Sequence, residues 1–574
     1  MSDQRVSPPL LAACLVGAGC QIETAASAVT EVNPIDGASS TSTGAGDEPG
    51  VTTGSGTTAV TSSGSADGES DGSGATGSGV SASASSGEGL PDDPPPTISS
   101  FAVSPAKMSL AGPITIDVGH SEDVVAVEIW RGGVLAFEVD PTWATATKTM
   151  LPIVHAPGDE GEVEIHAVVR DAGGQTATSE VEVVLVDLPA SGTLAWERVL
   201  PDGQESQALA VVALDQATAI GGFWADANLN ASATLGGLDA GGSLSWSAAD
   251  DLPPGALTTA LARRPSDGRL VVAGYTWDGA WQGSRPWARI FDPDGAPVST
   301  LWQGEPTSVI HAAATLSDGR VALAGAVLTN TQPTRWDARV WILSAGLDGV
   351  PVTVSWENPN SDLLQGEASD EVRSIAVTAT SDLLIAGVTE TRPGANEPKV
   401  PRAFALRLSG SGMIVDEWVA PPELGQHSGA LGIEADPLGG VLVAGWSRTP
   451  PSPGSSPMLL HLDGGLEVDA TWIDLGGPAG PSEARRLVRA PAGYLLAALS
   501  RYGAGVGTDI TIAAADEVAW FSAPIWAHDF PDPFATDQLV TDLDVSEFGF
   551  IHFVGWTYDG AAKHHKRIAG VLHP

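Results

Sequence analysis

The sequence predicts an all-β protein in which a seven-bladed β-propeller follows a β-sandwich and a disordered tether. First, one sequence pattern recurs seven times along the last two-thirds of the chain. In each copy an apolar run ends in Ala-Gly or a close variant, and a lone Trp follows within about 30 residues. Second, residues 97–188 alternate apolar and polar side chains with a period of two. Third, residues 21–96 contain almost nothing large and apolar.

The first 20 residues predict an export signal. Arg5 is followed by the apolar stretch Leu10–Gly19, and the only two cysteines of the chain are Cys14 and Cys20. This arrangement resembles a bacterial lipoprotein signal peptide, in which a cysteine is acylated and becomes the new N-terminus. We expect lipid attachment at Cys20, which leaves a more normal signal length. The alternative is Cys14, because Leu11–Ala13 before it fits the lipobox pattern better. The resemblance implies anchoring at the bacterial outer membrane or cell surface, and otherwise secretion.

The composition excludes several classes of function. The 574 residues carry a formal net charge of -43, with 70 acidic against 27 basic residues. Nucleic acid should repel such a chain, because phosphate binding needs clustered Lys and Arg. The absence of cysteine after residue 20 excludes disulfides, thiolate metal sites and cysteine catalysis from the folded part. No apolar run reaches the roughly 18 residues of a membrane-spanning helix, so we expect membrane contact through the lipid anchor alone.

Residues 21–96 predict a disordered acidic linker rich in Ser, Thr and Gly. No basic residue stands between Arg5 and Lys107, and the segment cannot bury enough apolar surface to offset the entropy of ordering. A flexible chain of this length would span about 50 Å on average. We expect it to hold the folded domains away from a membrane.

Residues 97–188 predict a β-sandwich of seven strands. The hairpin Ala167–Ala177 turns at Asp171–Gly174 and resembles the F–G hairpin of bacterial immunoglobulin-like domains. That resemblance implies two packed sheets. With no cysteine pair, we expect Trp130 and aliphatic side chains to fill the core. The predicted role is that of a spacer, with ligand binding as the alternative. The expected strands are Ile98–Val103, Ile114–Val118, Val124–Trp130, Val134–Val139, Thr145–Ile153, Val163–Val169 and Thr176–Val186.

Each copy after residue 190 divides into four strands, which make one propeller blade. Asp-Gly pairs between strands supply the positive φ of tight hairpins. We expect the Gly of each copy to allow a close backbone approach, and its Trp to be buried between blades. In the second copy the strands are 257–262, 269–275, 287–291 and 298–302; the third includes 321–325, 340–343 and 352–356. The apolar runs end at Gly222, Gly274, Gly325, Gly387, Gly445, Ala498 and Gly555. The tryptophans are Trp196, Trp246, Trp302, Trp356, Trp418, Trp472 and either Trp520 or Trp526.

The two ends of residues 191–574 complement each other. After Gly555 the last copy has a third strand near residues 567–572 but no Trp strand, whereas the strand 193–200 contains Trp196 and precedes any blade of its own. If 193–200 completes the last blade, seven full blades form a ring with no free edge. The sequence therefore predicts that the first and last strands of the domain pair with each other.

Segments such as Asp267–Thr276, Phe291–Gly295 and Trp302 resemble the repeats of bacterial exported seven-bladed propeller proteins. The resemblance covers residues 191–574 and implies the fold. Members of that group have varied activities, so the resemblance implies little about function.

No catalytic signature is present: the chain lacks a zinc-binding His-Glu-x-x-His, a phosphate loop with Lys, and a nucleophile elbow. We expect no catalytic residue, no bound metal and no cofactor. The Asp292–Gly295 turn weakly resembles a Ca²⁺ loop, but it lacks the further acids of such a loop, so a hairpin turn is favoured. His564, His565 and His573 are interpreted as a frayed surface tail.

Three of the copies contain an additional loop of aromatic residues and Asp after the second strand. Similar aromatic-Asp loops follow Gly274 and Gly555, and a related loop follows Gly222. Ring closure would make these three copies neighbours on one rim. The predicted ligand-binding residues are Trp224, Asp226, Trp277, Asp278, Trp281, Tyr558 and Asp559. Aromatic rings beside carboxylates suit a glycan or a peptide; the alternative is turn chemistry and blade packing.

The predicted function is that of a monomeric, surface-anchored binding, adhesion or scaffolding protein that recognises a glycan or protein through propeller loops. Two alternatives stay open. One is a secreted propeller hydrolase or lyase, and the other is a structural component of the cell envelope.

Overall fold

The computed structural model is built almost entirely from β-strands. Two short 3-10 turns that lie wholly within the described residues, Ala249–Asp251 and Pro422–Leu424, interrupt them. In the part that is described, no helix has the length and apolarity needed to cross a membrane. The structure describes residues 94–573 apart from 154–160, 201–204, 215–216, 227–229, 278–282, 332–333, 360–368, 393–397, 425–426, 438, 450–454, 474–481, 492, 504–506, 517–524, 531–536 and 560–563. The predicted signal peptide, its two cysteines and the tether up to residue 93 lie outside the described residues.

The first folded region is a sandwich of two sheets. One sheet has the strand order β1-β3-β6, and the other has the order β2-β9-β7-β4-β5 with β8 paired to β7. The strands are β1 (Ile98–Ser104), β2 (Lys107–Met108), β3 (Gly112–His120), β4 (Val124–Arg131), β5 (Val134–Val139), β6 (Ala146–Ile153), β7 (Gly161–Asp171), β8 (Thr176–Thr178) and β9 (Glu182–Val186).

The predicted strand Thr176–Val186 is divided into β8 and β9. Thr178 pairs with Val168, and Glu182 pairs with Ile165, so the register slips by one residue between the two pairs. At the slip, the Ser179 hydroxyl accepts a hydrogen bond from the backbone N–H of Ala167 (2.9 Å). The Ser179 side chain therefore accepts the hydrogen bond of a backbone N–H that a continuous strand would have paired with a carbonyl group.

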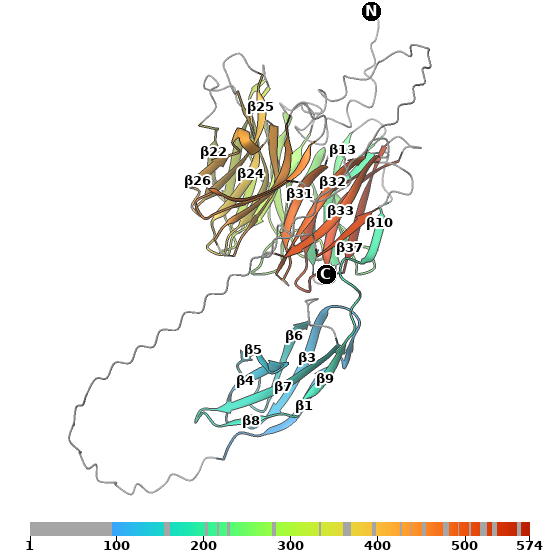
Figure 1. Cartoon of the computed structure of the whole chain (residues 1–574), viewed down its shortest axis with the longest axis vertical. Helices are drawn as coiled ribbons and strands as arrows, with labels where there is room; N and C mark the ends of the chain where they lie inside the picture. Colours follow the sequence, from blue (N-terminus) through green and yellow to red (C-terminus); the bar gives the residue numbers. More distant parts are fainter. Residues whose placement is uncertain are drawn as a thin grey trace, which may run out of the picture. The chain divides into compact units, whose positions relative to one another are not determined.

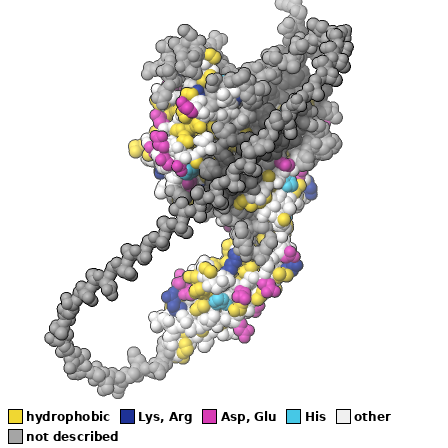
Figure 2. All heavy atoms as spheres, viewed as in Figure 1, with side chains coloured by type: hydrophobic (Ala, Val, Ile, Leu, Met, Phe, Trp, Pro, Cys, Tyr) yellow, Lys and Arg dark blue, Asp and Glu magenta, His cyan; other side chains and the backbone are white. Residues whose placement is uncertain are grey.

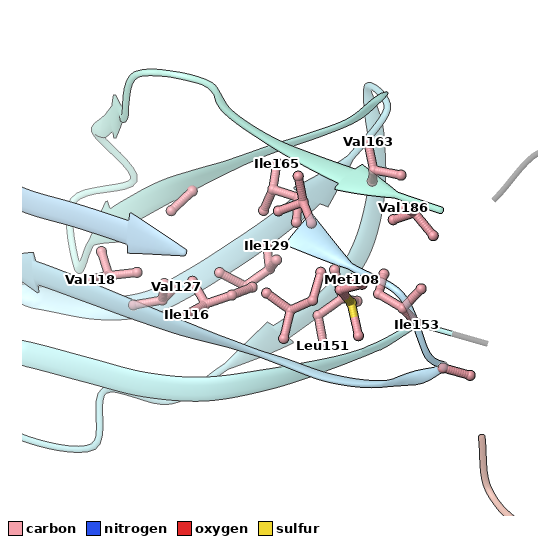
Figure 3. Packing of buried hydrophobic residues seen from close by; sticks show 14 of the residues in the cluster. Met108, Ile116, Val118, Val127, Ile129, Leu151, Ile153, Val163, Ile165 and Val186 are labelled. Atoms are coloured by element: carbon pink, nitrogen blue, oxygen red, sulfur yellow. The ribbon is translucent and has the colours of Figure 1, made fainter. Parts of the chain in front are cut away.

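The core of the sandwich is aliphatic. Figure 3 shows Ile116, Ile129 and Ile165 pointing into the space between the sheets, and each is fully buried. The expectation that Trp130 fills this core was wrong. Trp130 is only half-buried and stacks on His166 outside the core, with ring centroids 5.9 Å apart. Its indole N–H donates to Glu128, so the residue is placed where this polar group finds a partner.

The second region is a propeller of seven four-stranded antiparallel sheets, which confirms the predicted blade count. Blade 1 contains β11 (Glu205–Leu214), β12 (Ala217–Ala225), β13 (Ala231–Leu238) and β14 (Leu244–Ser247). Blade 2 contains β15 (Ala256–Arg263), β16 (Leu270–Thr276), β17 (Arg285–Phe291) and β18 (Trp302–Gln303). Blade 3 contains β19 (Ser308–Thr315), β20 (Val321–Thr331), β21 (Thr334–Leu343) and β22 (Val352–Trp356). Blade 4 contains β23 (Asp370–Val377), β24 (Leu383–Thr391), β25 (Val400–Leu408) and β26 (Ile414–Val419). Blade 5 contains β27 (His427–Ala435), β28 (Val441–Arg448), β29 (Ser456–Leu462) and β30 (Val468–Ile473). Blade 6 contains β31 (Ser482–Arg489), β32 (Tyr494–Gly503), β33 (Gly507–Asp516) and β34 (Trp526–Phe530). Blade 7 contains β35 (Gln538–Val545), β36 (Ile551–Asp559), β37 (His564–Leu572) and, from the start of the domain, β10 (Leu194–Val199).

The ring is closed by the strand that the repeat count predicts. β10 pairs antiparallel with β37, from Leu194 opposite Leu572 to Val199 opposite Ile568, and Figure 1 shows the two strands side by side. The inner strands contact one another in order around the ring, and β35 of blade 7 contacts β11 of blade 1. Because β10 covers β37, the last sheet has a full set of four strands.

The recurrence of a glycine at one strand position in six blades has a steric cause. Every inner strand has a β-bulge opposite the second strand of its blade. In six blades the residue opposite the bulge is Gly, and a methyl group there would overlap a carbonyl oxygen of the inner strand. The predicted close backbone approach is confirmed. The six are Gly222, Gly274, Gly325, Gly387, Gly445 and Gly555.

Blade 6 departs from the predicted alignment. Ala484 pairs with Leu499, and Arg486 pairs with Ala498, so the residue at the glycine position is Leu499 and not Ala498. A side chain at this position means that the close approach of the other six blades is not repeated in blade 6.

Two of the repeated Trp residues, Trp196 and Trp356, show the packing between neighbouring blades. Trp196 of blade 7 lies against Gly242 of blade 1, where a methyl group would overlap its ring. Trp356 of blade 3 stacks on Phe404 of blade 4, with ring centroids 4.4 Å apart. In blade 6 the fourth strand begins at Trp526, which decides between the two predicted candidates. The other candidate, Trp520, lies outside the described residues.

The fourth strand of blade 2 is shorter than the predicted 298–302, because β18 covers only Trp302–Gln303. Pro297 has no N–H to donate, and the Ser299 hydroxyl accepts the hydrogen bond from the backbone N–H of Ile290 (2.8 Å). A side chain therefore replaces part of the ladder.

One face of the propeller carries both acidic and apolar side chains. On the face seen in Figure 2, Asp and Glu side chains lie among hydrophobic ones in the region of β22 and β26. Val352 and Ile414, which lie on these strands, are exposed. The distribution agrees with the large negative charge of the chain.

Candidate binding site at the seam of blades 7 and 1

The described residues of the predicted patch lie where second strands end. Trp224 is near the end of β12, and Asp226 follows that strand. Trp277 follows β16 in blade 2. Tyr558 and Asp559 are the last residues of β36. Antiparallel pairing places these ends at the same rim as the beginnings of the inner strands. Asp278 and Trp281 lie outside the described residues.

The two described carboxylates of the patch have local partners. Asp559 forms an ion pair with Lys566 across the β36–β37 hairpin. Asp226 accepts hydrogen bonds from the backbone N–H and the side-chain amide of Asn230, both at 3.0 Å. Asp226 therefore serves turn chemistry, which was the alternative interpretation of its motif.

One interaction at this rim joins Glu205 of blade 1 to His565 of blade 7. The carboxylate of Glu205, at the start of β11, accepts from the backbone N–H of His565 at 3.0 Å. Its other oxygen lies 2.6 Å from Nδ1 of the imidazole. The side chains of Glu205 and His565 are only 8% and 18% exposed. A buried carboxylate thus fixes the orientation of one imidazole across the boundary between two blades.

Aromatic rings surround this imidazole. The rings of Trp556 and His565 meet edge to face, with centroids 4.4 Å apart. The ring of Tyr558 is tilted against that of His565, with centroids 5.4 Å apart. The indole N–H of Trp556 is buried and has no hydrogen-bond partner among the described residues. We call Glu205, Trp224, Trp556, Tyr558 and His565 the seam.

Trp224 belongs to the seam by register. Ser206 pairs directly with Trp224, so their side chains share a face of blade 1. The Ser206 hydroxyl accepts from the backbone N–H of Arg567 in blade 7. Trp224 is therefore on the face that blade 1 turns toward blade 7. Trp277 lies one blade farther along the rim.

The interpretation of His564, His565 and His573 as a frayed tail was wrong. His564 and His565 are part of β37, which lies between β36 and β10. His573 is 8% exposed, and its backbone N–H donates to Thr193 at 2.8 Å. The returning strand β10 covers the end of the chain and so orders it.

Sequence reasoning missed Glu205, Trp556 and His565. The predicted closure contained the signal for them, because pairing 193–200 with 567–572 already brings residues 205 and 565 to the same rim. The Asp292–Gly295 turn is a hairpin, as favoured: Gly295 has φ +87° and donates to Asp292. The Asp292 carboxylate accepts from Arg269 at 2.9 Å.

No protein-family model and no curated protein matches this chain. Solved structures with a similar fold include the periplasmic gluconolactonase PpgL of Pseudomonas aeruginosa, at 13% identity over 64% of this chain and 96% of that chain, with a TM-score of 0.39. Sqt1 from Chaetomium thermophilum matches at 15% identity over 64% of this chain and 84% of its own, with a TM-score of 0.37. A Dyadobacter fermentans protein of unknown function matches at 13% identity over 66% and 98%, with a TM-score of 0.36. These likenesses concern the fold alone and carry no argument about function.

Proposed function

We propose that this chain is a surface-anchored binding protein whose propeller recognises a neutral glycan at the seam. The observation that supports it most is the imidazole of His565, which Glu205 holds in one orientation beside the rings of Trp556 and Tyr558. Sugar rings present C–H faces to aromatic side chains and hydroxyl groups to fixed polar atoms. The seam offers both kinds of surface in one place.

The electrostatics favour a neutral ligand. The chain carries a net charge of -43, and such a field lowers the local concentration of anions at an exposed rim. Two basic residues follow His565 on β37: Lys566 is paired with Asp559, and Nη1 of the buried Arg567 donates to Thr234 of blade 1. Hydroxyl groups can be bound by hydrogen bonds alone, so a neutral sugar suits this surface better than an acidic one.

The remaining parts of the proposal concern how the propeller is displayed. The chain is proposed to be an exported lipoprotein of the bacterial propeller type, acylated at Cys20 or at Cys14 and carried on the tether of residues 21–96. The sandwich would act as an immunoglobulin-like spacer. Acyl labelling of Cys20→Ser and Cys14→Ser variants in a bacterial host tests the anchor, since only one substitution should abolish the label.

The glycan proposal is tested by retention on an array of neutral glycans. The double variant Trp224→Ala with Tyr558→Ala should lose retention. The matched control is Trp143→Ala, which removes a 60% exposed Trp from the sandwich and should bind as the unaltered chain does. Thermal unfolding of all three proteins shows whether the ring is intact. Retention on envelope proteins with none on glycans would overturn the glycan proposal, as would equal loss in the control.

A further inference from the structure

A ring of side chains surrounds the axis of the propeller at the level of the β-bulges. The extra residue of each bulge is half-buried in all seven blades. In blade 2 the hydroxyl of this residue, Thr259, donates to the carbonyl of Ile310 in blade 3 at 2.6 Å, and Thr541 of blade 7 donates likewise to Ala208 of blade 1. In these two blades the bulge side chain therefore reaches the inner strand of the next blade. The seven are Leu209, Thr259, His311, Arg373, Leu431, Arg485 and Thr541.

The bulge residues of blades 3 and 4 are His311 and Arg373. His311 has the bulge position of blade 3, and the charge of Arg373 in blade 4 acts on its imidazole. Nη2 of Arg373 donates to Glu371 at 2.7 Å, and the two side chains are 19% and 11% exposed. Nε of Arg373 and Nε2 of His311 are both buried and have no hydrogen-bond partner among the described residues. Buried polar groups of this kind usually have a partner.

Tyr275 of blade 2 lies within the electrostatic reach of Arg373 and Glu371. It pairs with Leu257, which has the same position in its blade that Glu371 has in blade 4. The intervening blade 3 has only the small Ala326 at the position of Tyr275, so no large side chain of that position separates Tyr275 from blade 4.

The electrostatics of the three blades are coupled. Burial raises the pKa of Tyr275, and the charge of Arg373 opposes that rise. Burial, assisted by the charge of Arg373, lowers the pKa of His311 to about 3. At neutral pH both rings are therefore uncharged hydrogen-bonding groups within the field of one guanidinium.

We propose that Arg373, His311 and Tyr275 form a binding site for a carboxylate-bearing ligand at the axis of the ring. The guanidinium supplies the charge and a free Nε–H donor, and the neutral imidazole supplies a further donor at Nε2. Glu371 orients the guanidinium through Nη2. The charge of Glu371 opposes an anion, so the ligand must be held by several hydrogen bonds and not by charge alone. The site is separate from the seam and takes a different class of ligand.

The chain contains its own control for this site. Blade 6 repeats the pair at the same strand positions, with Arg485 and Glu483 2.9 Å apart. However, the bulge residue of the preceding blade is Leu431 where the proposed site has His311. In blade 4, two blades before blade 6, the residue at the strand position of Tyr275 is Val388, as its pairing with Glu371 shows. Blade 6 therefore has the ion pair without the two neutral partners.

The experiment is a calorimetric titration of the purified full chain with sodium D-glucuronate, sodium acetate and D-glucose. In the Trp224→Ala, Tyr558→Ala chain, whose seam is disabled, glucuronate should bind saturably and glucose should not. Arg373→Gln should weaken glucuronate binding about tenfold or more, because a charge-assisted contact is lost. His311→Leu and Tyr275→Phe should each weaken it several-fold, which keeps the test valid if the Arg373 variant fails to fold. Arg485→Gln should leave it unchanged.

The arms of the titration separate two sources of the carboxylate. Acetate binding as tightly as glucuronate would support a site for any carboxylate, and much tighter glucuronate binding would support a site for an acidic sugar. The proposal is overturned if glucuronate does not saturate, if glucose binds equally well, or if Arg485→Gln weakens binding as much as Arg373→Gln does.

Discussion

Glu205 and His565 are 360 residues apart in the chain, yet one carboxylate holds both the backbone N–H and the imidazole of the other residue. The contact joins blade 1 to blade 7 beside the strand pair β10–β37 that closes the ring. Glu205 therefore has two roles: it fixes the imidazole of the seam, and it stabilises the closure on which the whole propeller depends.

Replacing Glu205 should weaken the closure. Glu205→Ala leaves the part-buried backbone N–H of His565 without its acceptor, so the free energy of unfolding in urea should fall by roughly 2 kcal/mol. The matched control is Glu138→Ala, which removes an exposed ion pair with Arg170 and should change stability by less than about 1 kcal/mol. An equal effect of both substitutions would show that the Glu205 contact does not stabilise the ring.

The glycine opposite each bulge should not tolerate a side chain. Gly555→Ala places a methyl group on the carbonyl oxygen of Leu539, so the strands must separate, and the unfolding free energy should fall by about 2 kcal/mol or more. Gly112→Ala is the control, because its methyl group would meet only the end of Met108 at an ordinary distance. A neutral Gly555→Ala in urea unfolding would contradict the steric account.

Removal of the ring of Trp196 should loosen the closing strand. Trp196 is 8% exposed and packs against blade 1, so Trp196→Ala should cost about 3–5 kcal/mol. The rate of amide hydrogen exchange should rise first in β37, because β10 then pairs less firmly with its outer edge. Uniform acceleration across all blades, with β37 no faster than β24, would argue against a local effect.

Stability should fall as the pH rises from mildly acidic to neutral. Burial raises the pKa of Asp370 to about 7, of Glu434 to about 7 and of Asp544 to about 6. In the unfolded chain these groups release their protons near pH 4, so between about pH 4 and 7 the folded state holds protons that the unfolded state has lost. Ionising them in place becomes a growing penalty over that range.

We therefore expect a higher thermal midpoint at pH 5 than at pH 8, measured at constant ionic strength. Asp370→Asn should reduce the difference between the two midpoints, because it replaces a fully buried carboxyl group with an amide that does not titrate. An unaltered chain that is more stable at pH 8, or an Asp370→Asn variant with the same difference, would contradict this assignment.

Strand periodicity and repeat spacing predicted most of the fold. The fourth strand of blade 3 has the predicted bounds, and the repeat count identified 193–200 as the closing strand. The errors are local. Leu499 occupies the glycine position in blade 6, and Trp130 lies outside the sandwich core, because strand register and side-chain direction depend on neighbouring strands that periodicity does not describe.

The candidate sites were less predictable. Trp224 and Tyr558 could be recognised from the aromatic loops, but Glu205 and His565 form a pair only because the ends of the domain meet. His311, Arg373 and Tyr275 come from three different blades and share no motif. The charge of Arg373 acts on both other rings across the blade boundaries, which a local sequence pattern does not describe.

By itself, the sequence determined the number of blades, the need for a closing strand and the acidic character of the chain, since repeat period and composition are properties of local sequence. Only the tertiary structure decided which side chains face one another across the blades. Those contacts arise when sheets far apart in the chain are brought together around one axis, and the register of each pairing decides which side chain points where.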